Sequence, residues 1–340
     1  MKKFLTALLC VCLAAFSAVG FAACGAGKSS EAVNLVAITA DQVGVADDID
    51  YYVVAEPAAS VKVNAIKPLQ FAGDLQKLYG GEKGYPQAVI VAKTELATGS
   101  TFVSNFLTAV SDSKEWLLSE STSAETVVNA VKSHLTDGMS PTFTAANLNK
   151  EVIKNCGINL TYSYDDKDEI KSFIEKFNSV SENSFGTPDD KFFWDGGCDE
   201  ALYNGNVSVY APDGAPALGI ANLLAGAEVP NDGSDVKYEV VNASLIQNFV
   251  TGANPKADIC VLPVNLAVKL LDNGEKYKLV ATLTHGNLYL LSKDGTEITA
   301  KNIGKLRGKT VGVVNLAAVP GLTFKVILEN HGIDYVELNG

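Results

Sequence analysis

The stretch Val207-Ser-Val-Tyr-Ala-Pro-Asp-Gly-Ala-Pro-Ala-Leu218 joins a short apolar run to a tight turn and the start of a helical pattern. The apolar run predicts a buried strand, and Asp213-Gly214 predicts a turn. Pro216 suits the first turn of the helix, where its missing N–H costs nothing. A strand followed by a turn and a helix is the repeating unit of α/β proteins, so this stretch predicts that fold class.

The same unit recurs on both sides of this stretch. Short apolar runs alternate with helical patterns, which favours βα units on mostly parallel sheets. Helices are expected at Pro216–Ala225, Leu322–His331, Lys150–Cys156 and Glu125–Leu135, the last with a capping box of Thr122 and Glu125. Strands are expected at Val33–Thr39, Tyr51–Ala55, Ala88–Ala92, Val207–Tyr210, Lys237–Val241, Asp258–Leu262, Leu279–Leu283, Leu288–Leu291, Thr310–Val314 and Tyr335–Leu338.

Between two such regions, Ser179–Asn206 is rich in Ser, Asn, Asp and Gly and has no periodicity. This composition predicts a linker over residues 181–205. Phe192-Phe193-Trp194 interrupts the linker, and three adjacent aromatic side chains favour burial. We expect them to dock on the folded surface and hold the linker there, with a lid over a ligand as the alternative.

The first 24 residues predict export. Lys2 and Lys3 precede an apolar run, and small residues stand directly before Cys24, as in the lipobox of bacterial lipoproteins. We expect residues 1–23 to be a signal peptide, Cys24 the lipidated N-terminus, and residues 24–30 a flexible tether. The protein would then be anchored to the outer face of the bacterial cytoplasmic membrane. Ordinary secretion with cleavage after Ala23 is the alternative.

The charge balance is acidic, with 39 Asp and Glu against 27 Lys and Arg and a net charge of −12. This argues against nucleic acid as a partner and against electrostatic attachment to anionic lipid. Outside the expected signal peptide, and apart from Cys24 and Cys260, only Cys156 and Cys198 are candidates for a disulfide, and free thiols are the alternative. There is no CxxC motif and no cluster of Cys and His, so neither a zinc site nor another metal or cofactor is expected.

Two long stretches resemble the two halves of one known family, in reversed order. Residues 206–340, which start with the unit quoted above, are similar to the beginning of the substrate-binding proteins of ABC importers for sulfonates, nitrate, taurine and thiamine-type pyrimidines. Residues 31–180 contain Asp50-Tyr-Tyr-Val-Val-Ala-Glu-Pro57 and Gly84-Tyr-Pro-Gln-Ala-Val-Ile-Val-Ala-Lys93, and they are similar to its end. The resemblance implies a circularly permuted type II periplasmic-binding fold.

That fold implies two doubly wound lobes around a cleft, joined by crossings near Thr284–Leu291 and Tyr85–Val91. One lobe would hold residues 86–180 and 206–288, and the other residues 31–85 and 289–340. The linker 181–205 would join the ancestral chain ends. The permutation also predicts that Glu31 and Gly340 are spatial neighbours, so that joining them would restore a continuous βαβ run.

Four strand-to-helix junctions are expected to open on this cleft, where helix N-termini present free N–H groups. Residues at the crossings can contact a ligand and move with closure. Turn formation and helix capping are the alternative roles for each residue, and His285 is the one histidine at a crossing. The candidate ligand-binding residues are Asp213, Gly214, Pro216, Asn265, Asn315, Pro320 and Glu56 at the junctions, and His285, Asn287 and Tyr85 at the crossings.

The only arginine, Arg307, precedes a strand and so points away from the cleft. Because carboxylate ligands are usually held by a bidentate arginine, a small neutral or heterocyclic ligand is favoured. The resemblance implies a receptor without enzymatic activity that delivers this ligand to ABC permease subunits by cleft closure. Two alternatives stay open: a pyrimidine-synthase-like enzyme on the same fold that uses His285, and a sensor or degenerate binder without a permease.

Overall fold

The computed structural model describes residues 31–80, 83–181, 185–230 and 233–338. The predicted signal peptide, Cys24, the tether and Gly340 lie outside these residues, so what was expected of them stays a prediction. Within the described ranges, no helix has both the length and the apolar character needed to cross a bilayer.

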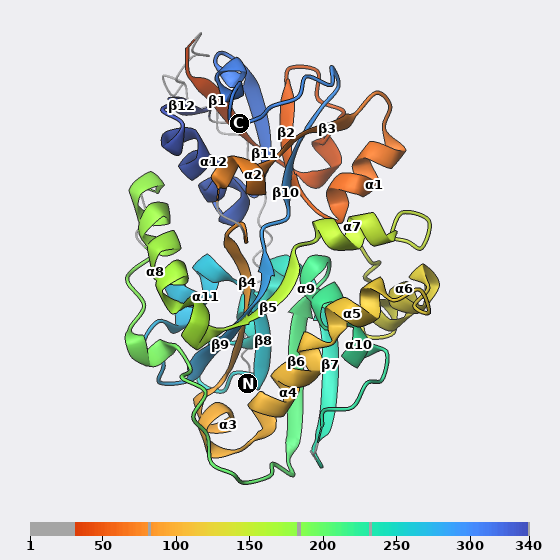
Figure 1. Cartoon of the computed structure of the whole chain (residues 1–340), viewed down its shortest axis with the longest axis vertical. Coiled ribbons are helices and arrows are strands. Elements are labelled where there is room, and N and C mark those ends of the chain that lie inside the picture. Colours follow the sequence, from red (N-terminus) through yellow and green to blue (C-terminus); the bar gives the residue numbers. More distant parts are fainter. Residues whose placement is uncertain (1–30, 81–82, 182–184, 231–232, 339–340) are drawn as a thin grey trace, which may run out of the picture.

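Two six-stranded sheets lie one above the other along the long axis of the molecule (Figure 1). Sheet A has the order β12-β1-β11-β2-β10-β3, and sheet B has the order β5-β9-β4-β8-β6-β7. The strands of sheet A are β1 (Val33–Ile38), β2 (Tyr51–Ala55), β3 (Gln70–Asp74), β10 (Leu288–Ser292), β11 (Thr310–Val314) and β12 (Tyr335–Leu338). Those of sheet B are β4 (Pro86–Lys93), β5 (Ile158–Tyr162), β6 (Asn206–Pro212), β7 (Asp235–Val241), β8 (Ile259–Pro263) and β9 (Tyr277–His285).

Helices connect and cover the strands, so the α/β class predicted from the sequence is confirmed. The helices are α1 (Ala58–Ala65), α2 (Leu75–Tyr79), α3 (Thr94–Gly99), α4 (Phe102–Ser111), α5 (Ser113–Leu118), α6 (Ala124–Lys132), α7 (Lys150–Asn155), α8 (Ser163–Val180), α9 (Ala215–Gly219), α10 (Ala221–Leu224), α11 (Val264–Leu271) and α12 (Val319–Asn330).

Two helix predictions need correction. The helix expected over Pro216–Ala225 is divided at Ile220 into α9 and α10. The start of α6 is capped by Ser123, whose hydroxyl accepts from the Thr126 N–H at 3.1 Å, and not by Thr122. Both residue types cap helices well, so the sequence alone does not separate two neighbouring candidates.

The expectation of mostly parallel sheets is confirmed only in part, because both sheets are mixed. In sheet A, β12, β1, β11 and β2 run parallel, whereas β10 is antiparallel to both β2 and β3. In sheet B, β7, β6 and β8 run parallel, whereas β4 is antiparallel to β8 and β9, and β5 is antiparallel to β9. A fully buried strand reads as an apolar run in either direction, so the sequence pattern does not encode its direction.

Each sheet contains an inner antiparallel strand that arrives from the other sheet. β4 follows β3 and α2 of sheet A, yet it lies between β8 and β9 of sheet B. β10 follows β9 of sheet B, yet it lies between β2 and β3 of sheet A. The described chain therefore passes between the sheets twice, once between α2 and β4 and once at Gly286-Asn287, between β9 and β10.

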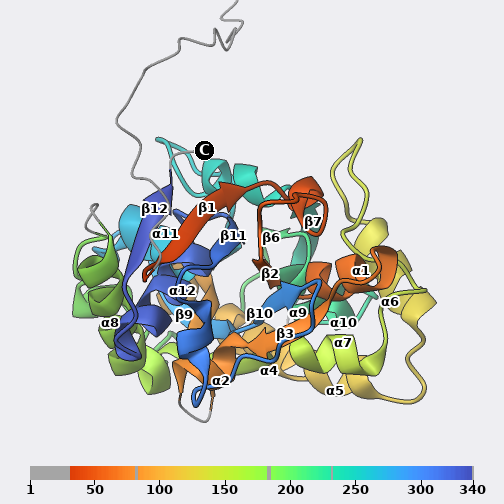
Figure 2. The ribbon, with the colours of Figure 1, turned by 90° about the horizontal axis from the view of Figure 1, so that it is seen from above.

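A continuous hydrophobic core joins the two sheets on one side of the molecule. It includes Leu35 of sheet A, Phe173 of α8 and Leu279 of sheet B, all almost completely buried. α8 packs against both α12 and β9, and Figure 2 shows α8, α11 and α12 on the side opposite α1, α6 and α7. Because large apolar surfaces are buried there, this side holds the two sheets together.

The aromatic residues of the linker are docked, as expected. Phe192, Phe193 and Trp194 are each no more than 6% exposed. The Trp194 N–H donates to the carbonyl oxygen of Leu279 in β9 at 2.9 Å, and its indole N–H donates to Gly197 at 3.0 Å. These contacts hold the linker along sheet B.

The proposed direct joining of the chain ends is not compatible with the pairing of β12 and β1. These strands are parallel neighbours, with Val33 opposite Tyr335 and Val36 opposite Leu338. Leu338 therefore lies about 10 Å along the strand direction from the start of β1, towards the C-terminal end of that strand. Parallel neighbours need a crossover connection of about a dozen residues or more, so the four residues Asn339, Gly340, Glu31 and Ala32 would be too few to join them.

Candidate functional site

The two crossings lie side by side between the sheets. In the pairing of β4 with β9, Pro86 is opposite His285. A side chain at Gly84 would approach the carbonyl oxygen of His285 to 3.3 Å, and one at Gly157 would overlap the carbonyl oxygen of Gly286. Gly84, Gly157 and Gly286 all have positive φ, at 83°, 66° and 61°. Glycine is thus required here both for its backbone conformation and for close packing.

Gln76 of α2 links the two crossings. Its Oε1 accepts hydrogen bonds from the Tyr85 hydroxyl and from the Leu288 N–H, both at 2.9 Å. Tyr85 belongs to the first crossing, and Leu288 begins β10 directly after the second. The Tyr85 ring is completely buried and stacks on Phe173, with ring centroids 5.6 Å apart. Tyr85, predicted as a ligand contact, is therefore packed in the core beside the first crossing.

His285 is paired with Asp166 at the start of α8. The distance from His285 Nε2 to Asp166 Oδ2 is 3.0 Å, and both side chains are almost completely buried. Burial acts to raise the pKa of Asp166, but the hydrogen bond from His285 and the polar hydroxyl of the nearby Thr282 outweigh it and hold the pKa below its usual value. This pair fixes the end of β9 at the point where the chain leaves sheet B.

Glu56 follows β2 and lies where sheet A meets the second crossing. Its N–H donates to the Asn287 carbonyl oxygen at 2.9 Å, and its own carbonyl oxygen accepts from Asn287 Nδ2 at 3.1 Å. Its carboxylate accepts from the N–H and the hydroxyl of Ser60, at 3.0 and 2.6 Å. The residue is only 2% exposed. Burial raises its pKa, and hydrogen bonds from Ser60 and Asn155 offset only part of that effect.

The turn after β6 approaches the turn after β2 from the other sheet. A side chain at Gly214 would lie 3.9 Å from Cδ of Pro57, so the two junctions face each other directly. Asp213 is occupied locally: its carboxylate accepts from the Gly214 N–H at 2.9 Å and from the N–H and hydroxyl of Thr142, at 2.7 and 2.5 Å. Its alternative role, fixing the turn and the loop before α7, is thus present, while Pro216 in the first turn of α9 is half-buried.

The remaining predicted junctions differ in exposure. Asn315 is exposed after β11 and has a φ of 62°, the one positive value among the described non-glycine residues. Apart from glycine, asparagine is among the residues that tolerate this left-handed conformation best, and the conformation is frequent at functional turns. Pro320 in the first turn of α12 is half-buried, whereas Asn265 in the first turn of α11 is buried.

Several buried polar atoms at these elements have no hydrogen-bond partner among the described residues. They are Oδ1 of Asn287, Nδ1 of His285, Oε1 of Gln87 at the start of β4, and Oδ1 of Asn265. Buried polar atoms in folded proteins are nearly always paired. The atoms of Asn287, His285 and Gln87 therefore mark the region around the crossings as one where a polar ligand could make hydrogen bonds.

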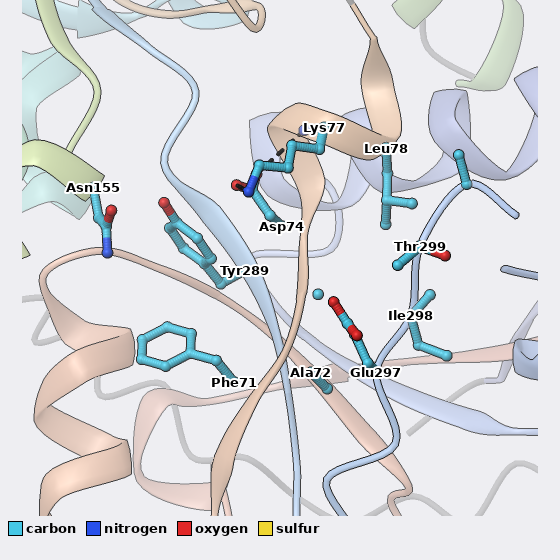
Figure 3. Close-up of a pocket in the computed structure, with 12 residues that line it drawn as sticks. Phe71, Ala72, Asp74, Lys77, Leu78, Asn155, Tyr289, Glu297, Ile298 and Thr299 are labelled. Atoms are coloured by element: carbon cyan, nitrogen blue, oxygen red, sulfur yellow. Dashed lines mark hydrogen bonds and ion pairs between the residues drawn. The ribbon is translucent and has the colours of Figure 1, made fainter. Parts of the chain in front are cut away.

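A groove of about 540 Å³ lies at the edge of sheet A, beside this region. Its walls are β3, β10, the start of α2 and the segment 297–300, and Asn155 of α7 lies at one end (Figure 3). None of the predicted ligand-binding residues lines it. The absence of a long apolar run in Gln70–Asp74 explains why β3, and with it the groove, was not predicted.

Some of the predicted residues are therefore brought together and others are not. Glu56 contacts Asn287, and Gly214 faces the turn that contains Glu56, whereas Asn265 and Asn315 stand at the junctions after β8 and β11. Gln76 and Asp166 were missed, because only the tertiary fold brings them to Tyr85 and His285. The described residues contain no group of three or more Cys, His, Asp or Glu side chains suited to a metal ion. Cys156, Cys198 and Cys260 are free thiols.

No protein family, curated protein or solved structure matches this chain at a significant level. What the fold itself establishes is an α/β protein with two mixed six-stranded sheets and two adjacent crossings between them.

Proposed function

We propose that this chain is an extracytoplasmic, lipid-anchored solute-binding protein that delivers a small molecule to an ABC importer by closing two lobes around it. The observation that carries the proposal is the pair of adjacent, glycine-containing crossings, which are the only links in the described chain order between sheets A and B. Such a connection allows two rigid bodies to rotate about a short hinge.

Closure would be driven by ligand contacts to both sheets. A ligand shifts such an equilibrium only as far as it binds the closed state more tightly than the open one. Pro57, which follows Glu56, already lies close to the turn of the other sheet, because a side chain at Gly214 would stand 3.9 Å from Cδ of Pro57. Glu56, His285 and Asn287 are each less than 5% exposed, so a solute would reach them only after the two sheets separate.

A small neutral or heterocyclic ligand fits this region better than a carboxylate. Arg307 donates to the Gly332 carbonyl oxygen at 2.8 Å, next to the start of β12 and thus at the sheet edge opposite the C-terminal ends of the parallel strands. The polar groups at the crossings are amides, an imidazole and a buried carboxyl group. These groups hydrogen-bond neutral ring nitrogens, amides and carbonyls.

The type II fold and its circular permutation form the finer part of the proposal. In their support, each sheet has an inner antiparallel strand that directly follows a crossing, so the two halves have similar strand arrangements. The linker 181–205 joins α8 to β6, two elements of the same half, as a connection between former chain ends would. The pairing of β12 with β1 requires that an ancestral connection there contained more residues than a direct joint.

The anchor and the permease are proposed from the sequence. Lipid on Cys24 would hold the protein at the membrane next to its permease. A Cys24→Ala variant should move from the membrane fraction to the soluble fraction while binding solute unchanged. Retention of this variant in the membrane fraction would contradict a lipid anchor at Cys24.

A thermal-shift screen of pyrimidines, sulfonates, nitrate and small amides tests the receptor function. A solute that binds the folded protein at 100 times its Kd should stabilise it by about 2.7 kcal/mol. Asn315→Gly keeps the left-handed backbone and removes the side-chain amide, so the unliganded Tm should hold while the ligand-induced shift decreases. An unchanged shift would remove Asn315 from the site, and no shift with any class would contradict the receptor.

The enzyme alternative gains no support from the arrangement of His285. Its imidazole is 4% exposed and already hydrogen-bonded to Asp166. The solute receptor is therefore the function that we propose.

A further inference from the structure

The groove at the edge of sheet A has an aromatic end. Phe71 of β3 and Tyr289 of β10 pack edge to face, with ring centroids 5.4 Å apart and an interplanar angle of 81°. Phe71 is 40% exposed, which is unusual for a phenylalanine on a sheet. The faces of aromatic rings carry negative potential and attract cations. This end therefore offers both apolar surface and a preference for positive charge.

The rest of the groove is acidic. Figure 3 shows Asp74 between the two rings and the segment 297–300, and Glu297 on the far side of β3 from the rings. Glu297 makes no ion pair with a described residue, whereas Asp74 is paired with Lys77 at 3.4 Å. The Lys77 side chain is 84% exposed, so this pair is weak. Burial, and then the negative charge of Asp74 and Glu56, raise the pKa of the Tyr289 hydroxyl.

The walls of the groove are held by hydrogen bonds before any ligand arrives. The Ile298 N–H donates to the Ala72 carbonyl oxygen of β3 at 2.7 Å, and the Thr299 N–H donates to Asn302 Oδ1 at 2.7 Å. Asp74 caps α2 by accepting from the N–H groups of Gln76 and Lys77. A side chain at Gly73 would approach the carbonyl oxygen of Ile298 to 3.1 Å, so glycine at this position lets the segment 297–300 pack closely against β3. A preformed site loses little entropy when it binds.

We propose that this groove binds a small organic ammonium ion, with its apolar or aromatic body against Phe71 and Tyr289 and its ammonium group between Asp74 and Glu297. Asn155 comes from α7 and also reaches Glu56, so the occupant would contact both halves of the molecule. The site is distinct from the junctions proposed to bind the imported solute, because none of those residues lines the groove.

The test measures the Kd of three probes of similar size by calorimetry at low salt: 2-phenylethylammonium, 2-phenylethanol and phenylacetate. The ammonium should bind best and phenylacetate worst. Added salt should weaken the binding of the ammonium but not that of the neutral alcohol. Binding of the alcohol as tightly as the ammonium would overturn the proposal, as would preferred binding of phenylacetate.

Three variants locate the site. Glu297→Gln should weaken the ammonium about threefold to fivefold without changing the alcohol, and Tyr289→Leu should weaken both probes. Lys77→Gln, on an exposed side chain that cannot disturb the core, should tighten the ammonium about twofold to threefold by removing a competing cation. Glu200→Gln, in the linker at the distant end of sheet B, is the matched control and should change nothing. A Kd for the ammonium that is unchanged by Glu297→Gln and by Lys77→Gln would overturn the proposal.

Discussion

Gln76 is a neutral residue on a five-residue helix, and its one amide oxygen serves two donors from different crossings. The Tyr85 hydroxyl is buried, so it cannot turn to bulk water if this acceptor is lost. A buried donor left without a partner costs its full desolvation penalty, which exceeds the net gain of an average hydrogen bond. We therefore expect Gln76 to contribute more to stability than an average side chain that makes hydrogen bonds.

Replacing Gln76 by alanine should lower the free energy of unfolding by about 2 kcal/mol, because it leaves the Tyr85 hydroxyl and the Leu288 N–H without their acceptor. Urea unfolding followed by circular dichroism measures this change. Gln247→Ala removes an exposed glutamine and should stay within about 0.5 kcal/mol of wild type. Equal stability of the two variants would show that Gln76 does not hold the crossings.

Glu56 should make stability depend on pH. Its pKa is raised in the folded state, so the folded protein holds this proton more tightly than the unfolded chain. The resulting stabilisation is complete below the ordinary glutamate pKa and is lost as the pH rises through the folded-state value. Relative to Glu56→Gln, wild type should lose stability with rising pH across that window. A difference between the two proteins that does not vary with pH would contradict a raised pKa.

Among the elements, strands with an apolar sequence pattern were predictable, whereas strands and contacts that depend on tertiary packing were not. β2, β11 and β12 have the bounds that were predicted from the sequence. β3 has Gln, Gly and Asp at three of its five positions, and β5 is a largely half-exposed edge strand, so neither has a strand-like pattern. Glu56 and Asn287 were each proposed from local chemistry, but their contact, like that of Gln76 with Tyr85, depends on tertiary packing.

The linker is an element whose role can be tested by cutting it. A protease site inserted at the exposed Gly196-Gly197 should be cleaved without separating the fragments, because the buried aromatic residues before it and the shared core keep both pieces in place. Size-exclusion chromatography of the nicked protein should show one species of unchanged size. Fragments that dissociate or aggregate would contradict the idea that the linker only joins former chain ends.

At the scale of the whole molecule, the core along α8, α11 and α12 and the crossings lie between the same two sheets. A rotation that opens the opposite side, near the turns at Pro57 and Gly214, would leave much of this core packed. The exposure of Glu56 and Asn287 would then change with the state of the molecule. The receptor proposal depends on this motion more than on any single side chain.

The distance between the two halves tests that motion most directly. Spin labels at Asn64→Cys in α1 and Asn129→Cys in α6, both exposed, can be placed in a background with Cys24 and Cys198 replaced by serine, which leaves the buried Cys156 and Cys260 in place. Pulsed electron paramagnetic resonance then gives the distance distribution with and without a solute found in the thermal screen. We predict a broad distribution without solute that collapses to its short component when solute binds. One unchanged distance in both samples would contradict closure by two lobes.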